Sequence, residues 1–468
     1  MNRFIGRSQE LSALNSLYNK EGFQMAVVYG RRRVGKSTLI KEFIKGKKSV
    51  FWSAIRTSAS RNLDLFTRQA MSVLSPETQG FHAENTQELF DFLGKCCHDE
   101  RIVIVIDEFP YWADEDRSLT SVMQLAIDSG WRDGNMFLIL CGSSVSFMEK
   151  EVLSEKSPLY GRRTAQLEIK PFKYWDAELF TPKYSAEEKA ICYGITGGIP
   201  YYLSMIDDSM SIDDNIRELY FTEHGYLYGE PSYLLAEEFT DVAAYSAIID
   251  AIAGGSNRPH LIADKTHMEA SAVSHSLRVL MATGIVGKEQ AITDEKNKKK
   301  VQYVLRDNMF KFWYMFVPNA IPLIEMGNVD AYYDRIVKPK INEYMGDVFE
   351  EMCRDYTLAA GAAGKLNCFV TETGKWWGTN QSTRKETDID VVGLSRAEDK
   401  AVIGECKYRN EPLDKDVLDA LMERDGLIDR KYKVVEYLLF SKSGFSKWVM
   451  EHKSDTITPI SLDDMYRM

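Results

Sequence analysis

The sequence predicts an α/β fold built on a parallel sheet, and three apolar runs carry that prediction. Residues 102–106 read Ile-Val-Ile-Val-Ile and lead directly into two carboxylates. A strand without polar alternation is buried on both faces, as in the centre of a parallel sheet. Further runs at 25–29 and 136–141 each end at a glycine, and helix-like stretches separate the runs. Strands that alternate with helices are typical of this fold class.

A glycine-bounded turn follows the first run, and Thr38 opens a helix-like stretch behind it. Glycines at both ends of such a turn let backbone N–H groups point inward around phosphates. Lys36 then reaches the β and γ phosphates, and the Ser37 hydroxyl is placed to ligate Mg2+. We therefore expect a nucleoside triphosphate at residues Gly30, Arg31, Arg32, Arg33, Val34, Gly35, Lys36, Ser37 and Thr38.

The two carboxylates after residues 102–106 are the second part of this site. Ligands lie at the carboxyl ends of the strands in an open parallel sheet, so Asp107 arrives beside the phosphates. We expect Asp107 to hold the Mg2+ shell and Glu108 to polarise the attacking water. The alternative is that one of the acids caps the next helix. Likewise, Ser143 or Ser144 either contacts the γ-phosphate or the water, or caps the helix that follows.

Length and composition indicate several intracellular domains. The 468 residues suggest about three domains, with 44% hydrophobic and 27% charged residues as in globular proteins. The start lacks a secretory apolar region, no apolar stretch reaches membrane-spanning length, and the seven cysteines show no disulfide or zinc spacing. We expect a cytoplasmic protein with no membrane partner. A net charge of -11 restricts any nucleic-acid contact to local patches, such as Lys296 with residues 298–300.

Two turns downstream carry further candidates. The arginine pair Arg162 and Arg163, in residues 157–164, is either a solvated turn, or one of the two is an arginine finger that supplies positive charge to the transition state, in its own or a neighbouring subunit. The turn at residues 197–201 is either a simple helix break or packs on the nucleotide.

Together these motifs resemble the archaeal-type ATPase family, a branch of the AAA+ class close to the STAND signalling ATPases. The resemblance covers roughly the first half of the chain. It implies that ATP is the nucleotide, that Arg162 contacts the triphosphate, and that the glycine–proline turn belongs to a helical lid. The residues that carry it are Phe4-Ile5-Gly6-Arg7 with Glu10-Leu11, the turn at Gly30, Asp107-Glu108-Phe109-Pro110-Tyr111, Gly142-Ser143-Ser144, Leu159-Tyr160-Gly161-Arg162 and Gly197-Gly198-Ile199-Pro200.

Residues 239–253, 261–267 and 271–282 predict three helices, and two short strands at 284–287 and 301–305 follow them. Three helices with a two-stranded wing describe a winged helix, in which 271–282 is the recognition helix. That helix offers only His275 and Arg278 as polar readers. DNA binding and a protein-contact or lid role therefore stay equal alternatives. The aromatic stretch 310–316 predicts core packing, and it resembles the bridge into a carboxyl-terminal domain of unknown function in the same family.

The carboxyl-terminal part predicts a hairpin of strands 388–393 and 401–407. Period-two geometry places Glu405 and Lys407 on one face, beside Asp390. Two carboxylates there suit Mg2+, with Lys407 activating water or stabilising a pentavalent phosphate. The bland alternative is a surface hairpin with a Glu405–Lys407 pair. Trp376 and Trp377 are expected in the core or at its rim, with base stacking as the alternative.

This pattern resembles the PD-(D/E)xK nuclease superfamily, which has a restriction-endonuclease-like α/β fold. The resemblance maps the metal ligands to Asp390 and Glu405, catalysis to Lys407, and support to Glu350. Ile389 stands where the name motif has proline, and either Glu350 or Glu351 points inward.

The expected organisation is an ATPase core at 1–170, a helical lid at 171–235, a winged helix at 236–318 and a nuclease-like domain at 319–468. The expected function is ATP-controlled, metal-dependent cleavage of nucleic acid. The alternative is a regulatory switch whose nuclease-like domain only binds a partner protein. An arginine finger acting in trans would require an oligomer.

Overall fold

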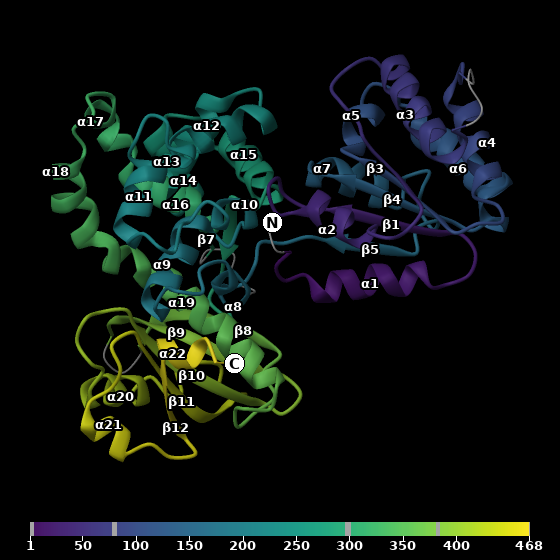
Figure 1. Ribbon diagram of the computed structural model, residues 1–468. Coiled ribbons are helices and arrows are strands. Elements are labelled where there is room, and N and C mark those ends of the chain that lie inside the picture. The colour runs from purple at the N-terminus through teal and green to yellow at the C-terminus, as the bar shows by residue number, and fades with distance from the viewer. Residues whose placement is uncertain (1–3, 77–81, 295–300, 381–383, 468) are drawn as a thin grey trace. The chain divides into compact units, whose positions relative to one another are not determined.

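The computed structural model describes residues 4–76, 82–294, 301–380 and 384–467 (Figure 1). The chain forms two compact units. The first unit holds Met1–Pro171 and Ile199–Tyr201, and the second holds Phe172–Gly198 and Tyr202–Met468. Lys296 and residues 298–300, the expected basic patch, lie outside the described residues. No helix in the described part of the chain is long and apolar enough to cross a membrane.

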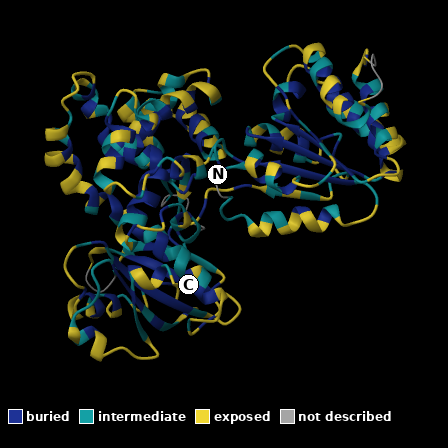
Figure 2. Ribbon diagram, viewed as in Figure 1, coloured by how far each residue is buried: buried dark blue, intermediate teal, exposed yellow. Residues whose placement is uncertain are grey.

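The first unit is built on a parallel five-stranded sheet, which confirms the predicted fold class. The strand order is β2-β3-β4-β1-β5. Every residue of β1, β3 and β4 is buried, as unbroken apolar runs require (Figure 2). The strands are β1 (Gln24–Tyr29), β2 (Ser49–Ser53), β3 (Ile102–Asp107), β4 (Met136–Gly142) and β5 (Ala165–Glu168).

Helices connect these strands, and an aromatic cluster of Trp52, Phe66 and Trp112 packs between them. The apolar spacing of residues 4–17 is typical of an amphipathic helix, but the helix begins only at Ser8, because Arg7 has a left-handed φ of 60° and precedes the first helical turn. The helices are α1 (Ser8–Tyr18), α2 (Lys36–Phe43), α3 (Ala59–Leu74), α4 (Thr86–Cys96), α5 (Phe109–Ala113), α6 (Leu119–Ser129) and α7 (Val145–Phe147).

The second unit begins with a group of helices. The aromatic helix α16 buries Phe310, Phe312 and Phe316, so the core prediction for residues 310–316 is confirmed. A two-stranded antiparallel sheet of β6 (Val286–Glu289) and β7 (Gln302–Leu305) follows three of the helices. The helices are α8 (Tyr174–Ala177), α9 (Ala186–Thr196), α10 (Pro200–Leu203), which spans the boundary of the units, α11 (Ile212–Tyr220), α12 (Tyr226–Glu238), α13 (Val242–Ala253), α14 (Pro259–Thr266), α15 (Ala270–Ala282), α16 (Asn308–Phe316), α17 (Ile321–Glu325) and α18 (Asp330–Tyr332).

A mixed five-stranded sheet with the order β12-β11-β10-β9-β8 completes the second unit. The hairpin of β9 and β10 is antiparallel, as predicted, and β10, β11 and β12 are mutually parallel. The long helix α19 packs on β8, β9 and β10. These elements are α19 (Lys338–Ala362), β8 (Glu372–Thr379), β9 (Glu386–Ser395), β10 (Lys400–Lys407), α20 (Lys415–Met422), β11 (Lys433–Ser441), α21 (Lys447–Glu451), β12 (Ile457–Ser461) and α22 (Leu462–Met465).

Candidate functional site

The turn between β1 and α2 has the backbone that phosphate binding requires. Gly30 has a φ of +147°, and a Cβ at this position would lie 2.3 Å from the Ile169 carbonyl oxygen. Gly35 has a φ of +88° and directly precedes α2. Only glycine tolerates both the left-handed backbone and the close approach of a neighbouring strand. The N–H groups that begin α2 therefore open toward the turn.

Lys36 lies inside this turn and is 5% exposed. Its Nζ donates hydrogen bonds to the carbonyl oxygens of Gly30 at 2.8 Å and Arg31 at 2.9 Å. Burial lowers the pKa of Lys36, and the nearby acidic side chains Glu108 and Asp107 act against that shift. The ammonium group is held at the centre of the loop, where a phosphate oxygen is able to replace the carbonyls.

Ser37 and Asp107 meet although they are 70 residues apart in sequence. The Ser37 hydroxyl donates a hydrogen bond of 2.7 Å to Asp107 Oδ2, and Asp107 is 4% exposed. A hydroxyl and a carboxylate side by side offer hard oxygen donors, which are the ligands that Mg2+ prefers with nucleotide phosphates. These two residues therefore suit the metal expected here.

Glu108 and Ser143 form the other half of the site. The Ser143 hydroxyl donates to Glu108 Oε2 at 2.7 Å. Glu108 has a left-handed φ of 49°, and its side chain does not cap α5. Ser144 precedes α7 and makes no capping hydrogen bond either. The capping alternatives are therefore wrong for Glu108, Ser143 and Ser144.

The arginines of the turn are held by aromatic residues. Arg32 donates to the Tyr111 hydroxyl at 2.8 Å, and Arg33 lies over the Tyr201 ring at 5.6 Å. Tyr201 belongs to the glycine–proline turn, and a Cβ on Gly35 would lie 3.8 Å from Pro200 Cγ. That turn is therefore more than a helix break, since it packs on the phosphate-binding loop within the first unit.

Arg162 lies near the amino ends of the strands of this sheet, whereas the phosphate loop lies at their carboxyl ends. Its guanidinium pairs with Asp128, and it also donates to the carbonyl oxygens of Pro158 and Tyr160. Two residues later, the Thr164 N–H donates to Met25 at the start of β1, whereas the phosphate loop follows the end of β1. Five residues of extended strand separate the two ends of β1 by about 16 Å. Arg162 thus lies toward the ends of the strands that are away from the phosphate loop of its own chain.

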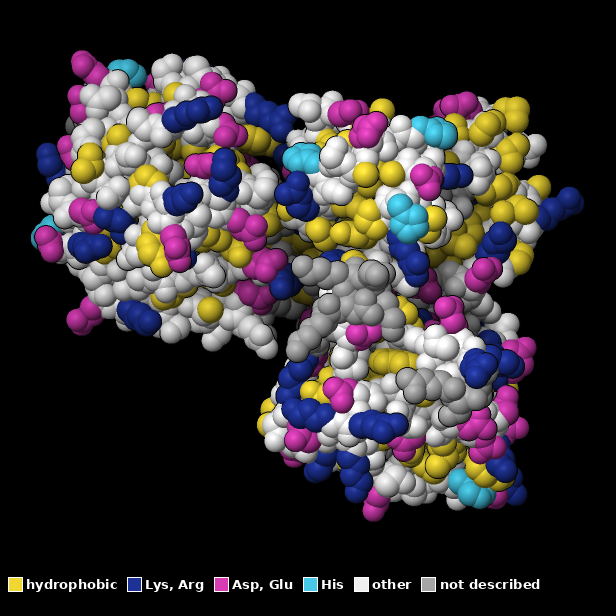
Figure 3. All heavy atoms as spheres, turned by 180° about the vertical axis from the view of Figure 1, so that it is seen from behind, with side chains coloured by type: hydrophobic (Ala, Val, Ile, Leu, Met, Phe, Trp, Pro, Cys, Tyr) yellow, Lys and Arg dark blue, Asp and Glu magenta, His cyan; other side chains and the backbone are white. Residues whose placement is uncertain are grey.

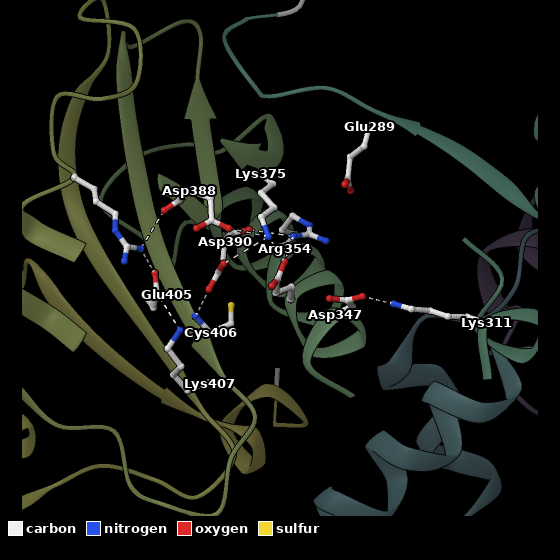
Figure 4. A network of polar contacts seen from close by, with 12 residues as sticks. Glu289, Lys311, Asp347, Arg354, Lys375, Asp388, Asp390, Glu405, Cys406 and Lys407 are labelled. Atoms are coloured by element: carbon white, nitrogen blue, oxygen red, sulfur yellow. Dashed lines mark hydrogen bonds and ion pairs between the residues drawn. The ribbon is translucent and has the colours of Figure 1, made fainter. Parts of the chain in front are cut away.

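The second unit brings the expected carboxyl-terminal residues together (Figure 4). Lys407 Nζ donates to Glu405 Oε1 at 2.7 Å, and the Cys406 N–H donates to Asp390 Oδ2 at 3.0 Å. Asp390 and Glu405 are 7% and 6% exposed. They thus face one another across the β9–β10 hairpin. The hairpin is buried here rather than on the surface, although the Glu405–Lys407 pair of that alternative is present.

Sequence reasoning missed the cations that hold these acids. Lys375 Nζ, on β8, lies 3.1 Å from Glu350 and 3.9 Å from Asp390. Arg354 donates to Glu350 Oε2 at 3.4 Å and to the Asp390 carbonyl oxygen at 3.0 Å. Arg424 pairs with Glu405. Lys375 lies on β8, which was not among the strands predicted for this part of the chain, so only the β8–β9 pairing reveals it.

These ion pairs correct the expected metal set. In the part of the chain that the structure describes, no group of three or more His, Cys, Asp and Glu side chains is arranged to hold a metal ion. Of the two candidate acids on α19, it is Glu350 that approaches Asp390, but its carboxylate is occupied by Lys375 and Arg354. Asp390 and Glu405 remain as a two-carboxylate oxygen set, which suits a hard divalent cation completed by water or substrate.

The buried carboxylates of Asp390 and Glu405 repel each other. Burial raises the pKa of Asp390 to about 7, and repulsion from Glu405 and Glu350 adds to the shift. The Cys406 N–H and Lys375 act in the opposite direction. Burial lowers the pKa of Lys407, but Glu405 and its hydrogen bond outweigh burial and raise that pKa overall. Lys407 is therefore held as a cation here.

A pocket of about 600 Å³ lies beside these residues within the second unit. None of Asp390, Glu405 and Lys407 lines this pocket. Lys375, Glu350 and Asp388 lie at the border between the pocket and the acid pair. Trp376 is buried in the core as expected, whereas Trp377 lines the pocket.

Two family models match different parts of this chain. A family model described as an ATPase domain predominantly from Archaea matches residues 4–206. A protein of Methanocaldococcus jannaschii, MJECL04, is 30% identical over 409 residues, which cover 87% of this chain and 88% of that protein. The chain belongs to the archaeal-type ATPase family. In this ATPase, a second model, described as archaeal and bacterial proteins of unknown function, matches residues 313–420.

Two solved structures are similar to this chain at lower sequence identity. The Walker-type ATPase PABY2304 of Pyrococcus abyssi is 19% identical with a TM-score of 0.49, over 66% of this chain and 96% of that chain. The ORC2 protein of Aeropyrum pernix, solved as ADPNP–ADP complexes, is 14% identical with a TM-score of 0.45, over 70% and 98% respectively.

Proposed function

We propose that this protein is a Mg2+-dependent ATPase of the AAA+ class whose ATP state controls a nuclease-like domain that acts on nucleic acid. The observation that carries the ATPase part is the Ser37–Asp107 hydrogen bond beside the Glu108–Ser143 pair. Lys36 and the loop amides bind the phosphates, Ser37 and Asp107 hold Mg2+, and Glu108 orients the attacking water. Mg2+ supplies charge neutralisation on the phosphates when bound.

The proposal assigns residues 236–318 to a winged helix and 319–468 to a nuclease-like domain. Support for the first is the order of α13, α14 and α15 before the antiparallel pair β6 and β7. His275 and Arg278 are exposed on α15. Support for the second is the mixed sheet, with Asp390 on β9 and Glu405 and Lys407 on β10. In cleavage, Asp390 and Glu405 would bind Mg2+, and Lys407 would stabilise charge on the phosphate.

Control by ATP is supported by the path of the chain around the glycine–proline turn. Residues 199–201 belong to the first unit, while α9 before the turn belongs to the second. In the second unit the Tyr344 hydroxyl of α19 donates to the Gly194 carbonyl oxygen of α9 at 2.6 Å. Lys442, after β11, pairs with Glu187 of α9 at 2.8 Å. The turn that packs on the phosphate loop is thus covalently joined to a helix bonded to the nuclease-like domain.

Charge distribution limits how nucleic acid would be held. On the face shown in Figure 3, Lys and Arg side chains alternate with Asp and Glu, without a continuous basic stripe among the residues drawn in colour. Binding would therefore depend on a local site rather than on a polyelectrolyte surface. Arg162 enters the proposal only as a finger donated to a neighbouring copy.

The test is cleavage of single-stranded, duplex and branched DNA with Mg2+ or Mn2+, with and without ATP. We expect metal-dependent cutting that is lost in Asp390→Ala and altered in Lys36→Ala. ATP hydrolysis should be lost in Lys36→Ala and kept in Asp390→Ala. No cutting under any condition, with ATP turnover intact, would reject the nuclease part.

A second function is favoured by the ion pairs of the carboxyl-terminal site. Lys375, Arg354 and Arg424 already neutralise the acids, an arrangement that suits a domain that binds a partner protein without cutting. ATP turnover that responds to a partner protein and not to DNA would support this regulatory switch. DNA-stimulated turnover would support the nucleic-acid function instead.

A further inference from the structure

The pocket of the second unit joins the two-stranded sheet to the carboxyl-terminal sheet. The segment after β6 inserts Ile292 into the core of the latter, and the Ile292 N–H donates to the Lys375 carbonyl oxygen at 2.9 Å. The pocket volume of about 600 Å³ falls in the range of about 300–1,000 Å³ typical of ligand sites. The pocket is therefore a cavity between the two-stranded sheet and the carboxyl-terminal sheet, which are in contact through Ile292.

Its walls carry opposite charges in pairs. Arg306, after β7, pairs with Glu289 at 3.0 Å. Lys311, on α16, pairs with Asp347 at 2.6 Å (Figure 4). The lining holds six acidic and five basic side chains, so the pocket lacks the excess positive charge of a groove for a long polyanion. A fitting ligand carries few anionic groups and has a neutral face as well.

Arg258 supplies the unmatched cation. It directly precedes α14, is exposed and lines the pocket. Its side chain makes no ion pair within the described residues. An arginine in this state binds a phosphate group through two parallel hydrogen bonds.

Trp377 supplies the neutral face. On β8 its neighbour Trp376 is 9% exposed and belongs to the core, so alternation along the strand turns Trp377 to the pocket. Trp377 is paired with Asp388 across β8 and β9. An indole beside an arginine matches a ligand that joins a planar base to a phosphate, because bases stack on aromatic rings without regard to sequence.

We infer that this pocket binds a short single-stranded segment of nucleic acid, with one base on Trp377 and a phosphate on Arg258. A duplex does not offer Trp377 a free base, because its bases are stacked on each other unless one is flipped out. The inference rests on the proposed function, for which it names the substrate class. Lys375 Nζ forms the inner end of the pocket and lies 3.9 Å from Asp390, so the bound strand ends beside the acid pair.

The test is fluorescence anisotropy of a short labelled oligothymidylate on the full chain, without divalent metal so that cutting cannot occur. We expect Trp377→Leu to weaken binding about tenfold, the lower end for one lost base stack, and Trp377→Tyr to restore much of it. Arg258→Ala should also weaken binding about tenfold. With one phosphate contact, at Arg258, the slope of log affinity against log salt should be about -0.7.

Matched controls lie in the same unit but outside the pocket. Trp448→Leu and Arg335→Ala should leave binding unchanged, since neither residue lines the pocket. A labelled duplex of the same sequence should bind more weakly, and unlabelled mononucleotide should compete poorly, which separates a strand from a free nucleotide. The inference is overturned if the duplex binds as well as the single strand, or if the mononucleotide displaces the strand at equal concentration. Unchanged binding in both Trp377→Leu and Arg258→Ala would overturn it too.

The outcomes separate this inference from the proposed function. Single-strand binding that depends on Trp377 supports the pocket even if the chain never cuts. Cutting that needs Asp390 but is unaffected by Trp377→Leu and Arg258→Ala supports the nuclease and overturns the pocket.

Discussion

The Ser143 hydroxyl at the end of β4 donates a 2.7 Å hydrogen bond to Glu108 at the end of β3. The Ser143 N–H lies 3.3 Å from the same carboxylate oxygen. In this position Glu108 has a left-handed backbone, which costs an L residue about 1–2 kcal/mol. A strained acid held by a neighbouring strand is typical of a group whose orientation matters for chemistry.

Ser143→Ala should therefore slow ATP hydrolysis without weakening ATP binding. Loss of the orienting hydrogen bond should lower kcat about tenfold, less than the loss of about 10²–10⁴ expected for Glu108→Gln. Steady-state turnover and nucleotide titration measure the two effects. Ser144→Ala is the control, because its side chain makes no capping bond, and an equal loss in both variants would contradict the prediction.

Ser37→Ala should raise the Mg2+ concentration needed for half-maximal turnover by about tenfold. The variant removes one of the two side chains that offer oxygen to the metal, while Lys36 and the loop amides remain for the phosphates. Turnover measured over a Mg2+ titration at saturating ATP checks this. Ser72→Ala, on the exposed face of α3, should leave the titration unchanged.

Asp390→Asn should stabilise the metal-free protein at high pH. The folded pKa of Asp390 is about 7, raised from 3.8, so the folded state binds its proton more tightly than the unfolded state. The wild type therefore loses stability as pH rises from about 4 to 7, and the loss is complete above pH 7. Asparagine cannot ionise and still accepts the Cys406 N–H. The free energy of unfolding should rise by about 1–3 kcal/mol at pH 8 and by less at pH 5.

Denaturant unfolding in EDTA at both pH values measures this difference. The control is Asp416→Asn, at an exposed position of α20. It should change the free energy of unfolding only slightly, and by the same amount at pH 5 and pH 8. A destabilised Asp390→Asn at pH 8 would show that the buried carboxylate is compensated rather than strained.

Lys375→Met should destabilise the second unit, because it leaves Glu350, Asp388 and Asp390 without their shared cation. Lys375 is about a quarter exposed, so solvent reduces the penalty from the 3–5 kcal/mol of a fully buried broken pair to about 1–3 kcal/mol. The loss should be larger at pH 8 than at pH 5, where protonation of Asp390 relieves repulsion. Adding Glu350→Gln to Lys375→Met should restore part of the stability, and a strictly additive double variant would contradict the coupling.

Arg162→Ala should leave ATP turnover of a dilute monomer unchanged, because the Arg162 guanidinium lies near the amino ends of the strands, away from the phosphate loop. If copies assemble, turnover per chain should rise with protein concentration in the wild type and not in Arg162→Ala. A reduced turnover of the monomer, at unchanged stability, would place Arg162 near its own nucleotide after all.

Much of the first unit was predictable because its signals are local. The turn from Gly30 to Ser37 depends on positive φ values, which only a few residue types tolerate, and β3 is an unbroken apolar run. The hairpin of β9 and β10 followed from alternation in the same way. In contrast, the start of α1 was missed by four residues, because apolar periodicity does not detect a left-handed residue such as Arg7.

The sequence by itself determined the phosphate loop, the acidic ends of the strands and the face shared by Glu405 and Lys407, because these depend on φ preferences and on a repeat of two residues. Only the tertiary structure decided which groups hold them. Ser143 reaches Glu108 across 35 residues and Lys375 reaches Glu350 across 25, and Arg162 is turned away from the nucleotide by the direction of β1. Such contacts arise from strand order and helix packing, which local propensity does not encode.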